Sequence, residues 1–592
     1  MDQSYQDVIR RRLAIPLDEG RDKVASLEEA VRRFVRPGML LYVGTAHARA
    51  NTLVREVVRQ WWGKDPGFTI ATLSLGSPWT ALILGGLVRR VITTFLGEGY
   101  PYPAPQPLIA SAVLEGRLAV QNWSMLSFPL RLIAGAMGVP FLPTKSLLGS
   151  TMEEDNARDG DFLVADDPFG GAARVGHVKA LVPDLALIHA WAADRAGNVL
   201  TTLPLNEGLY GAMAARHGAI VSVEKIVSTD FIRRHASLVR LPAQYVAAVV
   251  EAPLGAHPGG MYGMNVPDLE GYAEDLSFIL EMREAFRKRE TAEAWVREWM
   301  LGVSDQARYL ARLGHARVME VKGRAHMDAW VSELGSLSAN LSPAPANATE
   351  TMVVAASRIV AEKARASGYT TFLAGVGNAN LAAWLAAYRL KEAGAEIELM
   401  AEAGMVGYLP RPAEPYVFSF RNFPSCKMLT DVFHVMGIFM GGREAHCLGS
   451  LAAGQVDKHG NINSTVIPGV RYVTGSGGAN DVASSAREVV VTLAQSRQRF
   501  VDKVPYITAP GRRVSAVVSD RGVFEKSGEH GELVLTGVLG SGPEAEAVKA
   551  AREACGWELR VAPVLRRFEA PEPDELRLLR LFDPRRYFLG EL

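Results

Sequence analysis

Cysteine is scarce in this chain of 592 residues and occurs only at positions 426, 447 and 555. An odd number of cysteines at no metal-ligand spacing indicates neither a disulfide framework nor a zinc site, so we expect no bound metal. Cys447 follows His446, but neighbours on a strand point to opposite faces and make no catalytic pair. We therefore interpret Cys447 as a small, buried apolar residue.

An excess of charge of either sign is also absent, because lysine plus arginine and aspartate plus glutamate number 64 each. This balance favours neither nucleic acid nor an anionic membrane as the principal partner. No apolar run approaches the ~20 residues of a membrane span, and the first twenty residues contain no apolar core of signal-peptide length. The sequence thus predicts a soluble, cytoplasmic protein with no membrane partner.

The length of the chain predicts two or three domains, each large enough to bury its own core. A charged, helix-patterned segment runs from Arg287 to about Arg324, and a Pro/Ala/Asn/Ser stretch at 341–350 has the composition of a surface linker. We therefore divide the chain into a first domain at 1–290, a helical insertion with its linker at 291–348, and a second domain at 349–592.

Both large parts alternate short β-rich runs with amphipathic helical patterns. This alternation is typical of βαβ units on a largely parallel sheet, so we predict the α/β fold class. Several of the runs end in glycine just before a helical pattern. The runs lie at 39–44, 185–192, 219–226, 370–377, 396–402, 487–494 and 513–520.

The two parts also share a turn sequence. Asp194-Arg-Ala-Gly197-Asn198 follows one apolar run, and Asp457-Lys-His-Gly460-Asn461 is its counterpart in the second part. Glycine and asparagine tolerate positive φ, and aspartate accepts hydrogen bonds from nearby N–H groups, so each is a favourable turn. Together with the matching strand–glycine–helix openings, the repeat predicts two related α/β domains with a small-molecule cleft between them.

One candidate site feature is Gly375-Val-Gly377-Asn378, at the carboxyl end of an apolar strand and the start of a helix. Glycines there allow backbone N–H groups to approach a ligand, and the helix start favours an anion. The pattern lacks a third glycine at the dinucleotide spacing, so it predicts no Rossmann NAD site.

A second feature is Glu402, which ends the strand-like run 396–402 shortly before Gly404. Open α/β sheets place ligands at the carboxyl ends of their strands. A glutamate at such a position is often only a solvated turn residue. Its leucine, methionine and alanine neighbours would instead desolvate the carboxylate, which raises its pKa and its nucleophilicity.

A third feature is the loop of small residues at 475–478, followed by Ala479-Asn480-Asp481. Such a loop can present backbone amides to a ligand, or it can be a flexible surface loop. Composition alone does not separate these two interpretations.

In this order along the chain, the motifs resemble those of the class I coenzyme A transferases, in the form of the glutaconate type with its two chains fused. The second part resembles the β chain in Gly375-Val-Gly377, Ala401-Glu402-Ala-Gly404, 453–465 and 475–481. The first part resembles the α chain. Its matching segments are 44–49, 138–143, 167–169, 183–190, 194–199, 223–227 and 255–258.

The resemblance implies two open, NagB/RpiA-like α/β domains and a ping-pong transfer of coenzyme A from an acyl-CoA to a carboxylic acid. In that chemistry the family's glutamate, here Glu402, forms a glutamyl-CoA thioester. Small carboxylic acids and the CoA thioester are then substrates, no cofactor is permanently bound, and we expect a homo-oligomer. The implied oxyanion and CoA contacts are Gly375, Gly377, Asn378, Gly404, Gly477, Gly478, Ala479 and Asn480, and the substrate-side candidates are Gly44, Arg49 and Glu98.

Several positions depart from the family pattern. Ala403 follows the nucleophile where serine or asparagine is usual, Ala379 replaces a proline, and Ala50-Asn51 replace Lys-Pro. The region after Thr94 departs most, which affects the expected acyl specificity more than the reaction type. We interpret four further residues that stand out as structural or solvated, namely His189, Glu224, His257 and His459.

Two other functions remain open on the sequence. The first is a hydrolase on the same scaffold, either an acyl-CoA hydrolase or a C–C ring-cleaving enzyme, and Glu402 favours transfer over it. The second is a non-catalytic acyl-CoA-binding or regulatory protein, which has no need for a carboxylate directed at the thioester.

Overall fold

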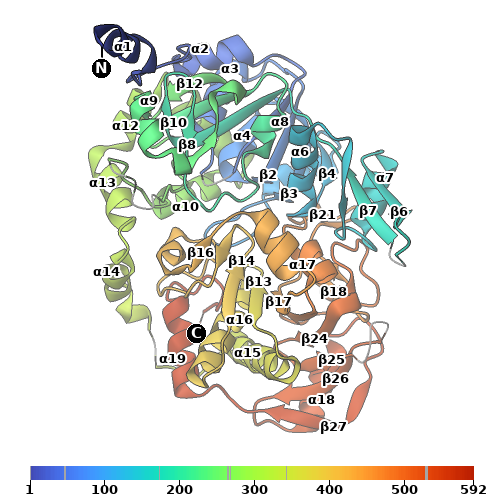
Figure 1. Ribbon diagram of the computed structural model, residues 1–592. Coiled ribbons are helices and arrows are strands. Elements are labelled where there is room, and N and C mark those ends of the chain that lie inside the picture. The colour runs from blue at the N-terminus through green and yellow to red at the C-terminus, as the bar shows by residue number, and fades with distance from the viewer. Residues whose placement is uncertain are drawn as a thin grey trace.

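The computed structural model describes residues 2–45, 48–171, 174–262, 266, 268–341, 343–526 and 531–591. Two mixed sheets organise the chain, one above the other in Figure 1, and helices pack around both. The α/β fold class and the tandem arrangement of two related domains are confirmed. No helix among these residues is long and apolar enough to cross a membrane.

The first sheet has nine strands and lies within the first part of the chain. Its central strand β8 is buried along its whole length, because apolar residues fill both of its faces. The strands are β1 (Leu40–Val43), β2 (Phe68–Leu75), β3 (Val88–Leu96), β4 (Ala119–Asn122), β8 (Leu185–Asp194), β9 (Val199–Leu200), β10 (Ala219–Val227), β11 (Val239–Leu241) and β12 (Val246–Glu251). All pair in parallel except β9 and β11.

The second sheet has ten strands, with a parallel centre and antiparallel pairs toward its ends. Its order is β16-β15-β14-β13-β17-β22-β24-β25-β26-β27. The strands are β13 (Thr371–Ala374), β14 (Glu398–Ala401), β15 (Met405–Val406), β16 (Met428–Leu429), β17 (Cys447–Leu451), β22 (Glu488–Thr492), β24 (Val514–Val518), β25 (Val523–Glu525), β26 (Val534–Leu539) and β27 (Val561–Phe568). Each strand expected in this part lies within its predicted run.

The repeated turn has the same hydrogen bonds in both parts. Asp194 Oδ1 accepts from Asn198 N at 2.8 Å, and Asp457 Oδ1 accepts from Asn461 N at 3.0 Å. The intervening glycines both have positive φ, at 95° and 81°. The shared sequence therefore corresponds to a shared structure.

Helices connect the two parts along one flank of the molecule (Figure 1). They are α10 (Leu276–Ala285), α11 (Arg289–Val296), η4 (Arg297–Leu301), α12 (Gln306–Leu313), α13 (His315–Arg324), α14 (Ala329–Ser336) and η5 (Ser338–Asn340). The predicted linker extends too far, because α15 (Ala348–Ser367) already begins inside 341–350. A capping box between Asn347 and Glu350 starts this helix.

The two parts pack against each other through a common apolar core. One cluster of buried side chains combines Trp123 and Leu126 of the first part with Val435 and Met436 of the second. Contact between the parts is therefore extensive, and residues distant in sequence can share one site.

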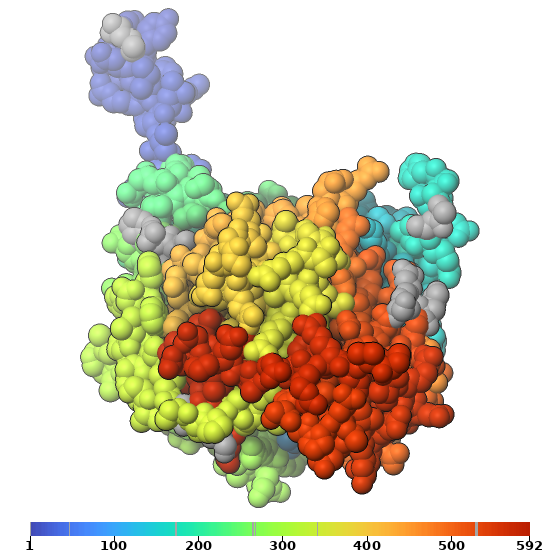
Figure 2. All heavy atoms as spheres, turned by 90° about the horizontal axis from the view of Figure 1, so that it is seen from below, coloured from blue at the N-terminus to red at the C-terminus, as the bar shows by residue number. Residues whose placement is uncertain are grey.

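Two elements project from this body. The N-terminal helical segment, α1 (Gln3–Val8) and η1 (Ile9–Leu13), extends away from it in Figure 2. On another side lies a small three-stranded sheet in the order β5-β7-β6, accompanied by α7 (Thr151–Arg158). Its strands are β5 (Phe141–Thr144), β6 (Phe162–Asp166) and β7 (Arg174–Lys179).

Candidate active site

A cavity of about 450 Å³ lies between the two parts, where the carboxyl ends of several strands meet. This volume is in the range of small-molecule sites, and the position agrees with the general placement of ligands in α/β folds. Its lining comes from both parts and includes seven of the predicted site residues. These are Arg49, Glu98, Gly375, Glu402, Gly477, Gly478 and Ala479.

Glu402 follows β14 directly, in the tight turn that leads into β15. Gly404 makes this turn possible, since its φ is 110° and an added Cβ would overlap the backbone carbonyl of Thr430. Gly404 itself does not line the cavity. It positions Glu402 and offers no contact to a ligand.

The surroundings of Glu402 favour its protonated form. Burial raises the pKa of its carboxyl, the nearby negative charge of Asp481 adds to this, and the result is a pKa of about 8. The chemical consequence is a carboxylate that is more basic, and so more nucleophilic, than an ordinary glutamate once it has lost its proton.

The loop of small residues crosses from the second part to the end of β3 in the first. Gly475 forms a bridge with Phe95, and Gly477 N donates to Thr94 O at 2.9 Å. Met125 N in turn donates to Gly477 O at 3.0 Å. The loop is therefore fixed by the other half of the protein and is not a flexible surface loop.

Gly478 lies against Glu402 at the start of α17 (Ala479–Ser485). An added Cβ at this position would overlap Oε2 of Glu402 and lie 2.9 Å from Met436 Cε. The backbone φ of Gly478 is −84°, so the need for glycine here comes from this contact alone. Among the hydrogen bonds of the described residues, Gly478 N has no acceptor, and this leaves it available to a ligand.

The other predicted amide donors are already used inside the protein. Gly375 N donates to Ser450 O at 2.8 Å, and Gly377 N donates to Asn380 Oδ1 at 2.7 Å. Gly377, Asn378 and Asn480 lie outside the cavity lining. The side chain of Asn480 instead accepts from Leu147 N and donates to Thr508 O, so it fastens the two parts together.

The substrate-side candidates of the first part differ from each other. Gly44 does not line the cavity and its amide donates to Leu187 O at 2.9 Å, while positions 46 and 47 of the same loop lie outside the described residues. Arg49 lines the cavity, donates to Ser74 Oγ at 2.8 Å and lies over the ring of Trp79. Arg49 forms no ion pair with any other described residue, so its charge can meet an anionic ligand.

Glu98 is buried on the same side of the cavity. Its carboxylate accepts a short hydrogen bond from Ser77 Oγ and lies 4.0 Å from the guanidinium of Arg283. Burial raises the pKa of Glu98, against the opposing effects of Ser77 and Arg283. It is a polar wall of the cavity that is already held by protein partners.

Two residues that the sequence did not single out complete the site. Asp481 is fully buried and accepts from Ser124 Oγ at 2.6 Å and from Leu126 N at 3.0 Å, both in the other half. Burial raises the pKa of Asp481 to about 6. Its place at the end of the small-residue motif is the one signal that could have drawn attention to it.

Asn206 connects the turn of Glu402 to the loop that carries Arg49. Its backbone N donates to Ala403 O at 3.3 Å, and its side-chain amide donates to Thr45 O at 2.8 Å. Its φ of 42° is uncommon for a residue with a side chain, and such strain collects at functional sites. The turn-like run Pro204-Leu-Asn206-Glu-Gly208 is the only trace of this in the sequence.

The residues interpreted as structural do have structural partners. Glu224 accepts from Tyr272 OH at 2.8 Å and lies 2.8 Å from His189. His257 lies between Asp275 and Tyr309, and His459 is exposed. Cys447 is buried, as its surroundings in the sequence predicted.

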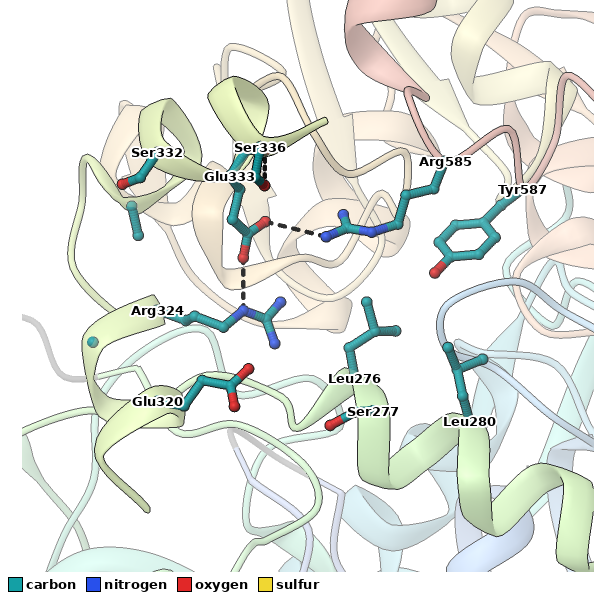
Figure 3. Close-up of a pocket in the computed structure, with 12 residues that line it drawn as sticks. Leu276, Ser277, Leu280, Glu320, Arg324, Ser332, Glu333, Ser336, Arg585 and Tyr587 are labelled. Atoms are coloured by element: carbon teal, nitrogen blue, oxygen red, sulfur yellow. Dashed lines mark hydrogen bonds and ion pairs between the residues drawn. The ribbon is translucent and has the colours of Figure 1, made fainter. Parts of the chain in front are cut away.

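A second pocket, of about 590 Å³, lies between the connecting helices and the C-terminal segment (Figure 3). Its central carboxylate, Glu333, points between Arg324 and Arg585, at 2.6 and 3.8 Å. Burial would raise the pKa of Glu333, but Arg421 and Arg324 outweigh it and hold the value at about 2. This carboxylate is neutralised within the protein, and the reactive carboxylate is the one in the cavity between the halves.

Comparison with known proteins agrees with this geometry. The family model described as "Coenzyme A transferase" matches residues 24–252 and 443–526, more than half of the chain. The chain belongs to the coenzyme A transferase family. Glu402 lies between the two matched segments, so its role is argued from the cavity.

The relatives include both kinds of polypeptide that make up two-chain transferases. The first of the two polypeptides of glutaconate CoA-transferase from Acidaminococcus fermentans is 28% identical over 314 residues, 51% of this chain and 94% of that protein. The second polypeptide of 3-oxoadipate CoA-transferase from Pseudomonas knackmussii is 36% identical over 158 residues, 23% of this chain and 59% of that protein. An uncharacterized protein of Archaeoglobus fulgidus is 32% identical, with 64% of its length covered.

A single-chain structure extends the similarity to the whole length of the protein. The acyl-CoA transferase apoenzyme of Escherichia coli O157:H7 aligns with a TM-score of 0.64, covering 98% of this chain and 99% of that one. Its sequence identity is 17%, so it bears on the fold of the transferase and not on its substrates.

Proposed function

We propose that this transferase moves coenzyme A from an acyl-CoA to a carboxylic acid through a thioester on Glu402. The observation that carries the proposal is the placement of the Glu402 carboxylate in the cavity, in contact with Gly478, whose amide is unused. A nucleophile and an oxyanion donor are thereby next to each other. We likewise propose the boundaries 1–290, 291–348 and 349–592 for its domains.

In the first half-reaction, a carboxylate oxygen of Glu402 attacks the thioester carbonyl, the carbon–sulfur bond breaks, and CoA leaves as a thiolate. The thiolate then attacks Cδ of Glu402 in the mixed anhydride, and the first acid leaves as a carboxylate. A second carboxylate takes the CoA by the reverse of these steps. No proton is gained or lost overall, and the thioester energy is conserved through the covalent intermediates.

The negative oxygen that develops at each attack needs a donor placed in advance. Loss of one such donor in other enzymes costs on the order of 3 kcal/mol of transition-state stabilisation. Gly478 N is the donor that we assign, since the amides of Gly375 and Gly377 bind Ser450 and Asn380.

Arg49 supports an acid with a second negative group as one of the substrates. It is a cation at the cavity wall without an ion-pair partner among the described residues, so a bound carboxylate would supply the missing charge. The names of the glutaconate and 3-oxoadipate relatives refer to dicarboxylic acids.

The test of the mechanism is intact-mass and peptide mass spectrometry after incubation with an acyl-CoA and no acceptor. We expect a CoA adduct on Glu402 that disappears when a carboxylic acid is added, and no adduct in Glu402→Gln. Release of free acid without an adduct would instead assign a hydrolase. Binding without turnover would assign a non-catalytic acyl-CoA-binding protein.

A further inference from the structure

The N-terminal segment at residues 2–15, here called the arm, makes no hydrogen bond to the body among the residues that the structure describes. All of its side chains are exposed except that of Asp7, which is half-buried. The nearest hydrogen bonds to the body are at its base, where Pro16 O and Leu17 O accept from Arg233 and from Asp230 N. A helix of this length is marginal in water unless one face is packed against something.

The arm carries an apolar stripe on one helical face. Tyr5, Val8, Ile9 and Leu13 follow the i, i+3, i+4, i+8 spacing of such a face, and they are 66%, 48%, 40% and 68% exposed. A stripe of this kind is typical of a helix that packs on an apolar surface. Arg10, Arg11 and Arg12 stand beside it and form no ion pair among the residues that the structure describes.

An apolar surface of matching kind lies on the small sheet β5-β7-β6, here called the wing. Pro143, His177 and Leu163 stand opposite one another in the strand register and share its outer face. Leu163 is 64% exposed, whereas Phe162 and Val178, on the inner face, are buried. Phe141 packs its ring against His177 at 5.1 Å and is itself half exposed.

The wing has the charge that the arm lacks. Asp166 ends β6, Asp167 follows it, and Glu154 lies on α7; none of the three forms an ion pair with another described residue. These carboxylates surround an apolar face, as the three arginines of the arm surround an apolar stripe. Their dimensions also agree, since eleven helical residues span about 16 Å and three strands about 14 Å.

We propose that the arm of one copy packs across the wing of a second copy of this chain. Arm and wing project from opposite sides of the molecule in both views (Figures 1 and 2), so the arm lies far from the wing of its own chain. Both surfaces belong to the same chain and complement each other in polarity and in charge. Reciprocal exchange of two arms gives a closed, two-fold assembly in which each apolar stripe is covered.

The experiment compares the mass of the full-length protein with that of arm and wing variants by sedimentation and native mass spectrometry. We expect wild type to be oligomeric, and Val8→Asp combined with Ile9→Asp to weaken self-association by at least about a hundredfold. Leu163→Asp on the wing should do the same. Met319→Asp, at an exposed methionine on α13, is the matched control and should leave the mass unchanged.

The arm variants are informative even if wing variants fold poorly, because the side chains of the arm are exposed and lie outside the core. Charge reversal of Arg10, Arg11 and Arg12 to glutamate should weaken the assembly, and adding Asp166→Lys and Glu154→Lys should restore it in part. Cross-linking of mixed heavy- and light-labelled protein should give arm-to-wing links between copies. A monomeric wild type, or arm variants with the wild-type oligomer mass, would overturn the proposal.

Discussion

Oε2 of Glu402 occupies the space into which a side chain on Gly478 would project. The two residues lie 76 positions apart in the sequence, one in a turn after β14 and the other at the start of α17. The contact sets the carboxylate beside a free backbone amide. It also makes the glycine a direct probe of the proposed chemistry.

Gly478→Ala should lower kcat by about a hundredfold, because the methyl group displaces the carboxylate by about 1 Å. The thermal midpoint should change little, since φ at this position suits any residue. The matched control is Gly477→Ala, where an added Cβ meets nothing within 4 Å but φ is 49°. This control should lose about 1 kcal/mol of stability and keep most of its turnover.

Equal turnover in the two glycine variants would remove Gly478 from the active site. A lowered midpoint with normal turnover in Gly478→Ala would make the loop a structural element only. Steady-state kinetics and differential scanning fluorimetry on the same preparations distinguish these outcomes.

The pH profile should report the raised pKa of Glu402. Below a pKa of about 8 the carboxyl is mostly protonated, so kcat/KM should rise about tenfold per pH unit and level off above 8. Asp481→Asn removes the negative charge that helps to raise this pKa. Its profile should therefore level off at a lower pH.

A profile that is flat from pH 6 to 9 in the wild type would contradict the protonation state assigned to Glu402. Stability gives an independent measurement with its own sign. An acid whose pKa is raised by folding loses stability as pH rises from its unfolded value through its folded value. Wild type should thus lose stability between the ordinary 4.5 and about 8 relative to Glu402→Gln.

Local sequence patterns predicted the strands well, because apolar runs and terminal glycines report on the backbone nearby. They predicted Glu402 and the small-residue loop through the order of the motifs. They could not predict that Asp481 bonds Ser124, which is 357 positions away, or that Asn206 joins two loops. Such contacts depend on how the halves pack, and no local periodicity records that.

Asn206→Gly tests the connection between the Glu402 turn and the Arg49 loop. Glycine keeps the backbone φ of 42° at no cost but removes the amide that donates to Thr45 O. A lost hydrogen bond of about 1.4 kcal/mol predicts a roughly tenfold rise in KM for the acid, with a small change in thermal midpoint. Asn198→Gly, at a turn outside the cavity lining, is the control and should leave KM unchanged.

The last prediction concerns the connection between the two parts. A protease site inserted after Leu341 should be cleavable without loss of activity, because the parts hold together independently of this segment. Asp481 binds Ser124, and the loop at 475–478 bonds to β3. Beyond the cut, Ala344 O accepts from Arg580 and Asn347 caps α15, so the new end stays on the second part. Size-exclusion chromatography should show the two fragments eluting together with the turnover of the uncleaved insertion variant. Fragments that separate, or that elute together without turnover, would show that the segment itself maintains the active arrangement.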